Sequence, residues 1–129
     1  MNKNLIHFLI KLKNASLSQK EIVKIESSKI CIALLEVLYN EGYIQSFQLK
    51  KEKNNKIFIV ITLRYFYNKP ILRNLHIISK PSSIKYMKLS DICKMADKRF
   101  VFFFSTSKGF MTSLNCKKNK IGGKLLFMC

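Results

Sequence analysis

Apolar positions in the first half of the chain recur at spacings that predict two helices and three strands. Those at 5, 8, 9 and 12 lie three or four residues apart, as on one face of a helix over about residues 3–14. Residues 21–25 alternate like a short strand, and a helical pattern then runs from the candidate caps Ser27 and Ser28 to Gly42, a common helix stop. Strand-like runs at 43–50 and 57–65 flank a basic turn and predict a hairpin. Because residues 57–63 are apolar on both faces, both faces of that strand are candidates for burial.

The second half of the chain predicts mainly short strands. Lys69-Pro70 interrupts the pattern, because proline lacks an N–H group and restricts the residue before it, so we place a boundary between residues 1–68 and 69–129. The expected fold is α+β, with an N-terminal α-β-α-β-β half packed together with a β-rich C-terminal half that holds short helices. The elements expected after the boundary are strands at 71–78, 84–86, 100–104 and 125–129, and helices at about 89–95 and after the candidate cap Thr112.

A polar segment, residues 105–109, follows the apolar run 100–104 without a break. Its sequence is Ser105-Thr106-Ser107-Lys108-Gly109, so hydroxyls, a cation and a glycine follow an expected buried strand. Hydroxyls and backbone N–H groups donate hydrogen bonds to phosphate oxygens and base edges, and glycine allows close backbone approach. The segment is also compatible with a polar turn that has no ligand.

Two enzyme motifs are present only in part. Ser105 and Lys108 have the serine-x-x-lysine spacing of penicillin-binding enzymes, but the Ser-Asp-Asn and Lys-Thr-Gly motifs are absent and 129 residues are few for that fold. Gly122-Gly123-Lys124 resembles part of a phosphate-binding loop, but Lys118 and Leu125 stand where that loop needs glycine and Ser or Thr. We therefore expect no catalytic residues and no enzymatic activity.

The charge of the chain favours a polyanionic partner. Lys and Arg number 24 against 7 Asp and Glu, a net charge of +17. Residues 1–63 carry 10 basic and 5 acidic groups, a net +5, whereas residues 64–129 carry 14 and 2, a net +12. So large a positive field attracts nucleic acid first and an anionic membrane surface second. The second half is expected to face the polyanion.

Composition excludes several other classes of protein. A hydrophobic fraction of 48% with 10 Phe is too apolar for a disordered basic tail. The four cysteines include no Cys-x-x-Cys pair and neither histidine adjoins one, so we expect no zinc, no other cofactor and no disulfide framework. The apolar stretch 5–10 is interrupted by His7 and closed by Lys11, so it predicts neither a secretory signal nor a membrane span.

The polar segment and the glycine pair together resemble a known signature. The family of the eighth protein of the small ribosomal subunit carries Ser-Thr-Ser-x-Gly, then Met-Thr, and about ten residues later Gly-Gly-Glu. This chain has residues 105–109, Met111-Thr112 and Gly122-Gly123 at the same spacing. Weaker similarities extend along the chain, at residues 13–15, 28–29, 41–44, 63–65, 79–81 and 85–86.

The resemblance implies a primary binder of small-subunit ribosomal RNA that docks on the central domain of that RNA and supports subunit assembly. Its further partners would be neighbouring ribosomal proteins, with no membrane and no small-molecule substrate. Hydroxyl, lysine and tyrosine side chains suit recognition of the shape of folded RNA, through its 2′-hydroxyls, phosphates and exposed base edges. Simpler interpretations stay open for Tyr86, as a half-buried strand residue, and for Lys29, as a solvated helix start. The residues expected to contact RNA are Asn14, Lys29, Lys80, Lys85, Tyr86, Ser105, Thr106, Ser107, Lys108, Gly109, Thr112, Gly122, Gly123 and Lys124.

Departures from the family pattern suggest a divergent ribosome. Lys124 stands where the family has glutamate, Ser82 where glycine follows Lys-Pro, and residues 95–99 where the family has a glycine-rich approach. The 16 Ile, 21 Lys and 10 Asn indicate an A/T-rich coding genome. We therefore expect an organellar ribosome, mitochondrial first, with a plastid or the bacterial cytoplasm as alternatives. The alternative function is a free-standing basic protein that binds RNA or an anionic surface.

Overall fold

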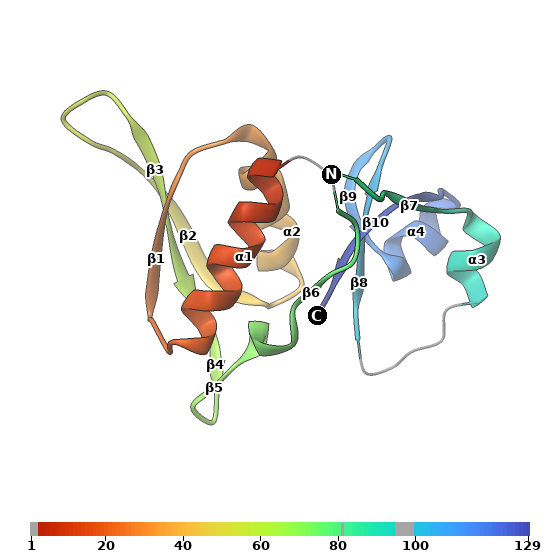
Figure 1. The fold of residues 1–129 in the computed structure, drawn as a ribbon, viewed down its shortest axis with the longest axis horizontal. Helices are drawn as coiled ribbons and strands as arrows, with labels where there is room; N and C mark the ends of the chain where they lie inside the picture. The colour runs from red at the N-terminus through yellow and green to blue at the C-terminus, as the bar shows by residue number, and fades with distance from the viewer. Residues whose placement is uncertain (1–2, 81, 95–99) are drawn as a thin grey trace. The chain divides into compact units, whose positions relative to one another are not determined.

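The computed structural model describes residues 3–80, 82–94 and 100–129. Contacts between Cα atoms divide the chain into two compact units. We call residues 7–73 the N-terminal unit, and residues 74–129, together with the start of the first helix, the C-terminal unit. Helices accompany antiparallel sheets in both units, so the predicted α+β class is confirmed (Figure 1). In the described part of the chain, no helix has both the length and the apolar character needed to cross a bilayer.

The N-terminal unit is a three-stranded antiparallel sheet with two helices on one of its faces (Figure 1). The strand order is β1-β3-β2, and the apolar stripes of both helices are buried, as Leu9, Leu12 and Leu34 illustrate. The predicted order of helix, strand, helix, strand, strand is confirmed. These elements are α1 (Lys3–Leu17), β1 (Ile22–Glu26), α2 (Lys29–Asn40), β2 (Ile44–Lys51) and β3 (Ile57–Leu63).

The second helix ends where the sequence predicts. Gly42 follows its last turn with a φ of +82°, a conformation that costs glycine little. The N–H groups of Gly42 and Tyr43 donate to the carbonyls of Tyr39 and Leu38 at 3.1 and 2.9 Å, the Schellman arrangement that satisfies the last carbonyls of a helix. At the other end, Ser28 is the N-cap by its extended backbone, without a side-chain hydrogen bond to the helix backbone.

The second face of this sheet is less buried than the apolar pattern suggests. Ile59 and Ile61 are fully buried on the helix side, whereas Phe58 and Val60 on the opposite side are half-buried. The ammonium group of Lys24, on β1, lies 4.5 Å from the centroid of the Phe58 ring. A lysine side chain therefore covers part of the face where no helix packs.

A short hairpin that the sequence did not predict follows β3. Its strands are β4 (Tyr65–Phe66) and β5 (Lys69–Pro70), joined by a turn at Tyr67 and Asn68. Both turn residues have positive φ, +49° and +63°. Positive φ at both central positions is the type I′ geometry, whose twist matches that of the flanking strands.

The predicted strand at 71–78 is wrong over its first half. Residues Ile71–Asn74 form a 3₁₀ helix, η1, and only His76–Ile77 form a strand, β6. Leu72 and Leu75, three residues apart, are both almost fully buried. The apolar residues of this segment therefore follow a helical spacing rather than the alternation of a strand.

The C-terminal unit is organised around its last strand, β10. That strand pairs antiparallel with β8 along one edge and with β6 and β7 along the other, and β9 extends the sheet beyond β8. The elements after β6 are β7 (Lys85–Met87), α3 (Leu89–Lys94), β8 (Phe102–Thr106), β9 (Gly109–Thr112), α4 (Ser113–Asn119) and β10 (Gly123–Met128).

The two short helices of this unit contribute to a core on one face of the sheet. Ile92 of α3 and Cys116 of α4 are buried with Phe104 and Leu125 of the central strands. Phe103, which alternates with Phe104 along β8, stacks instead on Phe127 of β10, with ring centroids 4.6 Å apart. The apolar run of β8 is therefore buried on both of its faces, as expected for a core strand.

The tip of β8 differs from the prediction. The strand begins and ends two residues later than expected, so Ser105 and Thr106 lie within it, and the unpredicted β9 makes the tip a β-hairpin. The cap expected at Thr112 is confirmed, because its hydroxyl accepts a hydrogen bond from the Asn115 N–H at 3.5 Å. Residues 95–99, where the glycine-rich approach of the family is replaced, lie outside the described residues.

Candidate nucleic-acid interface

One row of side chains crosses four strands of the C-terminal sheet. Lys124 on β10 is the partner of Tyr86 on β7 and of Ser105 on β8, and Ser105 is in turn the partner of Phe110 on β9. Cross-strand partners project from the same face of a sheet. A phenol, an ammonium group, a hydroxyl and a phenyl ring therefore lie side by side, although they come from separate segments of the sequence.

The row borders an open hollow of about 440 Å³. The Ser-Thr-Ser segment and the glycine pair, which the sequence singled out independently, meet there. Ile121 is a further lining residue that the sequence did not single out, because nothing distinguishes it from a buried isoleucine. The lining residues are Tyr86, Ser105, Thr106, Ser107, Ile121, Gly122, Gly123 and Lys124.

Gly122 and Gly123 leave no room for a side chain. A Cβ atom at Gly123 would lie 2.7 Å from the carbonyl oxygen of Ser105 and 2.9 Å from Cγ2 of Thr106. A Cβ atom at Gly122 would lie 2.8 Å from the carbonyl oxygen of Met87. The glycine pair therefore allows β10 to approach both of its neighbours closely and leaves bare backbone at the hollow.

The hairpin turn is held by the hydroxyl of Thr106. This hydroxyl donates to the carbonyl of Gly109 at 2.8 Å and accepts from the N–H of Lys108 at 3.2 Å. Gly109 has a φ of +107°, and a Cβ atom added there would meet no atom within 4 Å. Glycine is therefore favoured at this position by the positive φ and not by close packing. Among the described residues, the hydroxyls of Ser105 and Ser107 have no hydrogen-bond partner, which leaves them available to a ligand.

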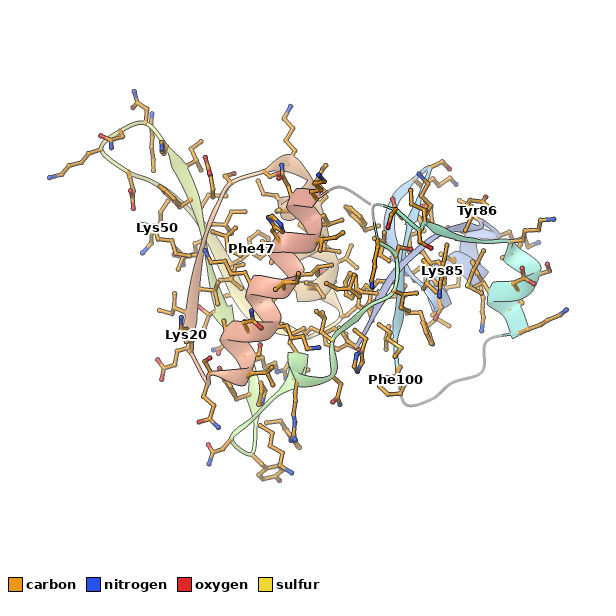
Figure 2. All side chains as sticks on the ribbon, in the orientation of Figure 1. Lys20, Phe47, Lys50, Lys85, Tyr86 and Phe100 are labelled. Atoms are coloured by element: carbon orange, nitrogen blue, oxygen red, sulfur yellow. The ribbon has the colours of Figure 1, made fainter. Side chains whose placement is uncertain are left out.

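The chemistry around the hollow suits an anion with exposed ring surfaces. Lys108 and Lys124 are exposed, and Tyr86 is 65% exposed. Figure 2 shows the side chain of Tyr86 on β7. No carboxylate of the described residues lines the hollow. Ammonium groups and hydroxyls bind phosphate and 2′-hydroxyl oxygens, and an exposed ring offers a stacking surface for a base.

The remaining predicted residues lie outside the hollow. Lys80 and Lys85 are exposed elsewhere in the C-terminal unit, and Asn14 and Lys29 are exposed in the N-terminal unit. Thr112 is almost fully buried and caps α4, so its hydroxyl serves the fold. Of the fourteen predicted residues, the structure thus brings seven together at one hollow, and Lys108 and Gly109 adjoin them in the same hairpin.

The surroundings of Ser105 show no nucleophile activation. Its hydroxyl makes no hydrogen bond to Lys108, whose backbone N–H bonds Thr106 instead. In the described ranges, no three His, Cys, Asp or Glu side chains gather as metal ligands would. The arrangement supplies binding groups on a preformed surface.

Comparison with known proteins points to one family. The model of the family described as ribosomal protein S8 matches residues 4–129. Small ribosomal subunit protein uS8 of Stenotrophomonas maltophilia (strain K279a) is 34% identical over 126 residues, which cover 98% of this chain and 96% of the relative. The uS8 proteins of Ehrlichia chaffeensis and of Wolbachia pipientis are 32% and 33% identical, over 93% and 92% of this chain and 91% and 90% of their own lengths.

Proposed function

Because the chain belongs to the ribosomal protein S8 family, we propose that it is a structural component of the small ribosomal subunit that binds the RNA of that subunit. The family is one of structural proteins of the ribosome and not of enzymes. Its relatives cover almost the whole chain, so the proposal concerns both compact units.

The observation that carries the RNA-binding proposal is the row Tyr86, Lys124 and Ser105 beside the Ser107 hydroxyl. A cation, an exposed ring and two hydroxyls without protein partners lie at a hollow with bare glycine backbone. The A-form major groove is inaccessible to side chains, so proteins read folded RNA at irregular minor grooves and exposed bases. We propose that the hollow binds such a site in the central domain of the small-subunit RNA.

Residues away from the hollow have a different proposed role. Asn14, Lys29, Lys80 and Lys85 are exposed polar side chains that contribute long-range attraction or single phosphate contacts. Thr112 is excluded from the contact surface, because its hydroxyl is buried at the start of α4. Affinity for any RNA would therefore come largely from lysines, and selectivity from the hollow.

The proposal is tested by measuring binding of the purified protein to a transcribed central-domain fragment of small-subunit RNA. We expect steep loss of affinity with salt, as counterions are released from phosphates. Ser107→Ala removes one hydrogen bond to the RNA, which is worth about 1 to 3 kcal/mol, so affinity falls roughly fivefold or more. Ser46→Ala, a half-buried serine on β2 in the other unit, is the control and leaves affinity unchanged.

Two outcomes would contradict the proposal. Equal affinity of the wild-type protein for an unrelated RNA duplex, with no effect of Ser107→Ala, would reduce the site to nonspecific attraction. Sedimentation of the native protein apart from ribosomal particles would favour the alternative of a free-standing basic protein.

The compartment of the ribosome is a separate part of the proposal. The relatives named above come from bacteria, which supports a ribosome of the bacterial type. The mitochondrial assignment rests on composition and on the departures from the family pattern at Lys124, Ser82 and residues 95–99, and the bacterial relatives give it no support. Sequencing the RNA that sediments with the protein decides between an organellar and a bacterial small-subunit RNA.

A further inference from the structure

The β4–β5 hairpin of the N-terminal unit exposes two aromatic rings at its turn. Phe66 is 65% exposed and Tyr67 is 85% exposed. Their rings touch edge to face, with centroids 4.4 Å apart and planes at 74°. Both large rings are therefore exposed and contact each other, on a hairpin that projects from the unit (Figure 1).

The backbone at Tyr67 makes this exposure more unusual. Its φ of +49° is a region that favours glycine, asparagine and aspartate, and a bulky residue there is uncommon. A type I′ turn at positions 67 and 68 is most easily made by Asn-Gly. Neither the turn geometry nor the protein core explains a tyrosine at position 67. This indicates that the ring contacts a partner of the unit.

The charge around the hairpin selects the class of partner. Residues 64–73 include Arg64, Lys69 and Arg73 and no acidic residue. Lys69 and Arg73 are exposed, whereas the guanidinium of Arg64 also donates to the carbonyl of Gly42 at 3.2 Å. Exposed rings among cations suit single-stranded nucleic acid, because bases stack on aromatic faces while phosphates pair with lysine and arginine.

We propose that the β4–β5 hairpin is a second RNA contact, in which an unpaired base of the small-subunit RNA stacks on Tyr67 and a neighbouring phosphate pairs with Lys69. The inference rests on the proposed function, since it takes the RNA of the subunit as the ligand. It assigns to the N-terminal unit a stacking contact that is separate from the hollow at Lys124. The two contacts differ in chemistry, because the hollow offers hydroxyls and bare backbone and the hairpin offers rings.

The chain contains no tryptophan, so Tyr67→Trp introduces a single fluorescent reporter at the hairpin. Added to transcribed full-length small-subunit RNA, this variant keeps an aromatic ring at position 67 and is expected to lose much of its emission as a base stacks on the indole. Tyr39→Trp is the matched control, because Tyr39 is 51% exposed on α2 of the same unit, and its emission is expected to stay constant. Filter retention measures RNA binding of both variants independently of fluorescence.

Two further variants separate stacking from charge. Tyr67→Asn removes the ring but suits the positive φ, so the variant folds at least as well and its RNA affinity falls about fivefold to a hundredfold. Its salt dependence stays that of the wild type, whereas Lys69→Gln lowers the slope of log affinity against log salt by about one.

The outcomes distinguish this inference from the function on which it rests. Full RNA retention without quenching of Tyr67→Trp, or with no loss of affinity in Tyr67→Asn, overturns the hairpin contact and leaves the proposed function standing. A blue shift of the reporter only after the other subunit proteins are added also overturns it and assigns the hairpin to a protein neighbour. Absence of RNA retention by the wild-type protein overturns both.

Discussion

The close packing around Gly123 makes the size of this residue a test of how the hollow is built. In Gly123→Ala the new Cβ atom meets the Ser105 carbonyl oxygen at 2.7 Å, whereas ordinary contacts begin at 3.4 Å. Either β8 or β10 must therefore move by about 0.7 Å. Movement of β10 is resisted, because it is paired with β7 on its other edge. Overpacking of this kind costs about 1 to 3 kcal/mol of unfolding free energy.

Urea denaturation followed by circular dichroism measures this cost, and a loss of 1 to 3 kcal/mol shifts the midpoint by roughly 1 M. RNA affinity, measured where the variant is still folded, falls as well, because Ser105 carries the strain. Gly109→Ala is the comparator. It meets no atom within 4 Å, so its cost of about 1 to 2 kcal/mol comes from the positive φ alone. A Gly123→Ala protein with wild-type stability and wild-type RNA affinity would refute the close-approach explanation.

Two further predictions concern buried groups of the C-terminal unit. Ser79→Ala removes a buried hydroxyl that donates to the Leu125 carbonyl and accepts from the Lys85 N–H at 3.3 Å. Thermal or urea unfolding should show that the free energy of unfolding falls by about 1 to 3 kcal/mol. The control Ser83→Ala, at an exposed serine, should lower it by less than about 0.5 kcal/mol. Burial raises the pKa of Cys129 from 9.0 to about 12. The unfolded thiol releases its proton first, so stability falls as pH rises from 9 towards 12, and Cys129→Ala should flatten that decline, whereas an unchanged slope would contradict this assignment.

The N-terminal unit is predicted well because its signals are local. Periodicity fixes α1 and α2, and Gly42 marks the end of the second helix with the geometry expected of it. The exception is the β4–β5 hairpin, which has only two residues in each strand and a Tyr-Asn turn in place of Asn-Gly. The strands are too short to show an alternation of apolar and polar residues, and the turn lacks the Asn-Gly pair, so the sequence does not predict this hairpin.

The C-terminal unit shows what local patterns leave out. The segment 71–78 mixes five apolar residues with Arg73, Asn74 and His76, so the sequence alone does not distinguish alternating from helical burial. Leu72 and Leu75 follow the helical spacing. The strand β9 has four residues and begins with glycine, a residue depleted in strands. It is defined by its pairing with β8, which is a tertiary contact.

The candidate site was predictable in its parts and not in its assembly. The hydroxyl segment and the glycine pair are recognisable by residue type. Their position beside Tyr86 depends on the pairing of β10 with β7 and β8, which the sequence does not reveal. The sequence also did not separate Thr106, whose hydroxyl holds the turn, from Ser105 and Ser107, whose hydroxyls are available to a ligand. Residue type alone does not reveal which hydroxyl is already occupied.

The position of β10 in the sequence has a consequence for synthesis. Its three partners, β6, β7 and β8, all precede it along the chain, so their sheet stays incomplete until residues 123–128 have been made. Elements of the N-terminal unit pair among themselves before that point, and domains generally fold as units during synthesis, the N-terminal one first. A nascent chain that stalls before β10 therefore lacks the strand that joins Tyr86 to Ser105. On the proposed function, only chains translated through β10 would present the complete hollow to RNA, and unfinished chains would lack this contact.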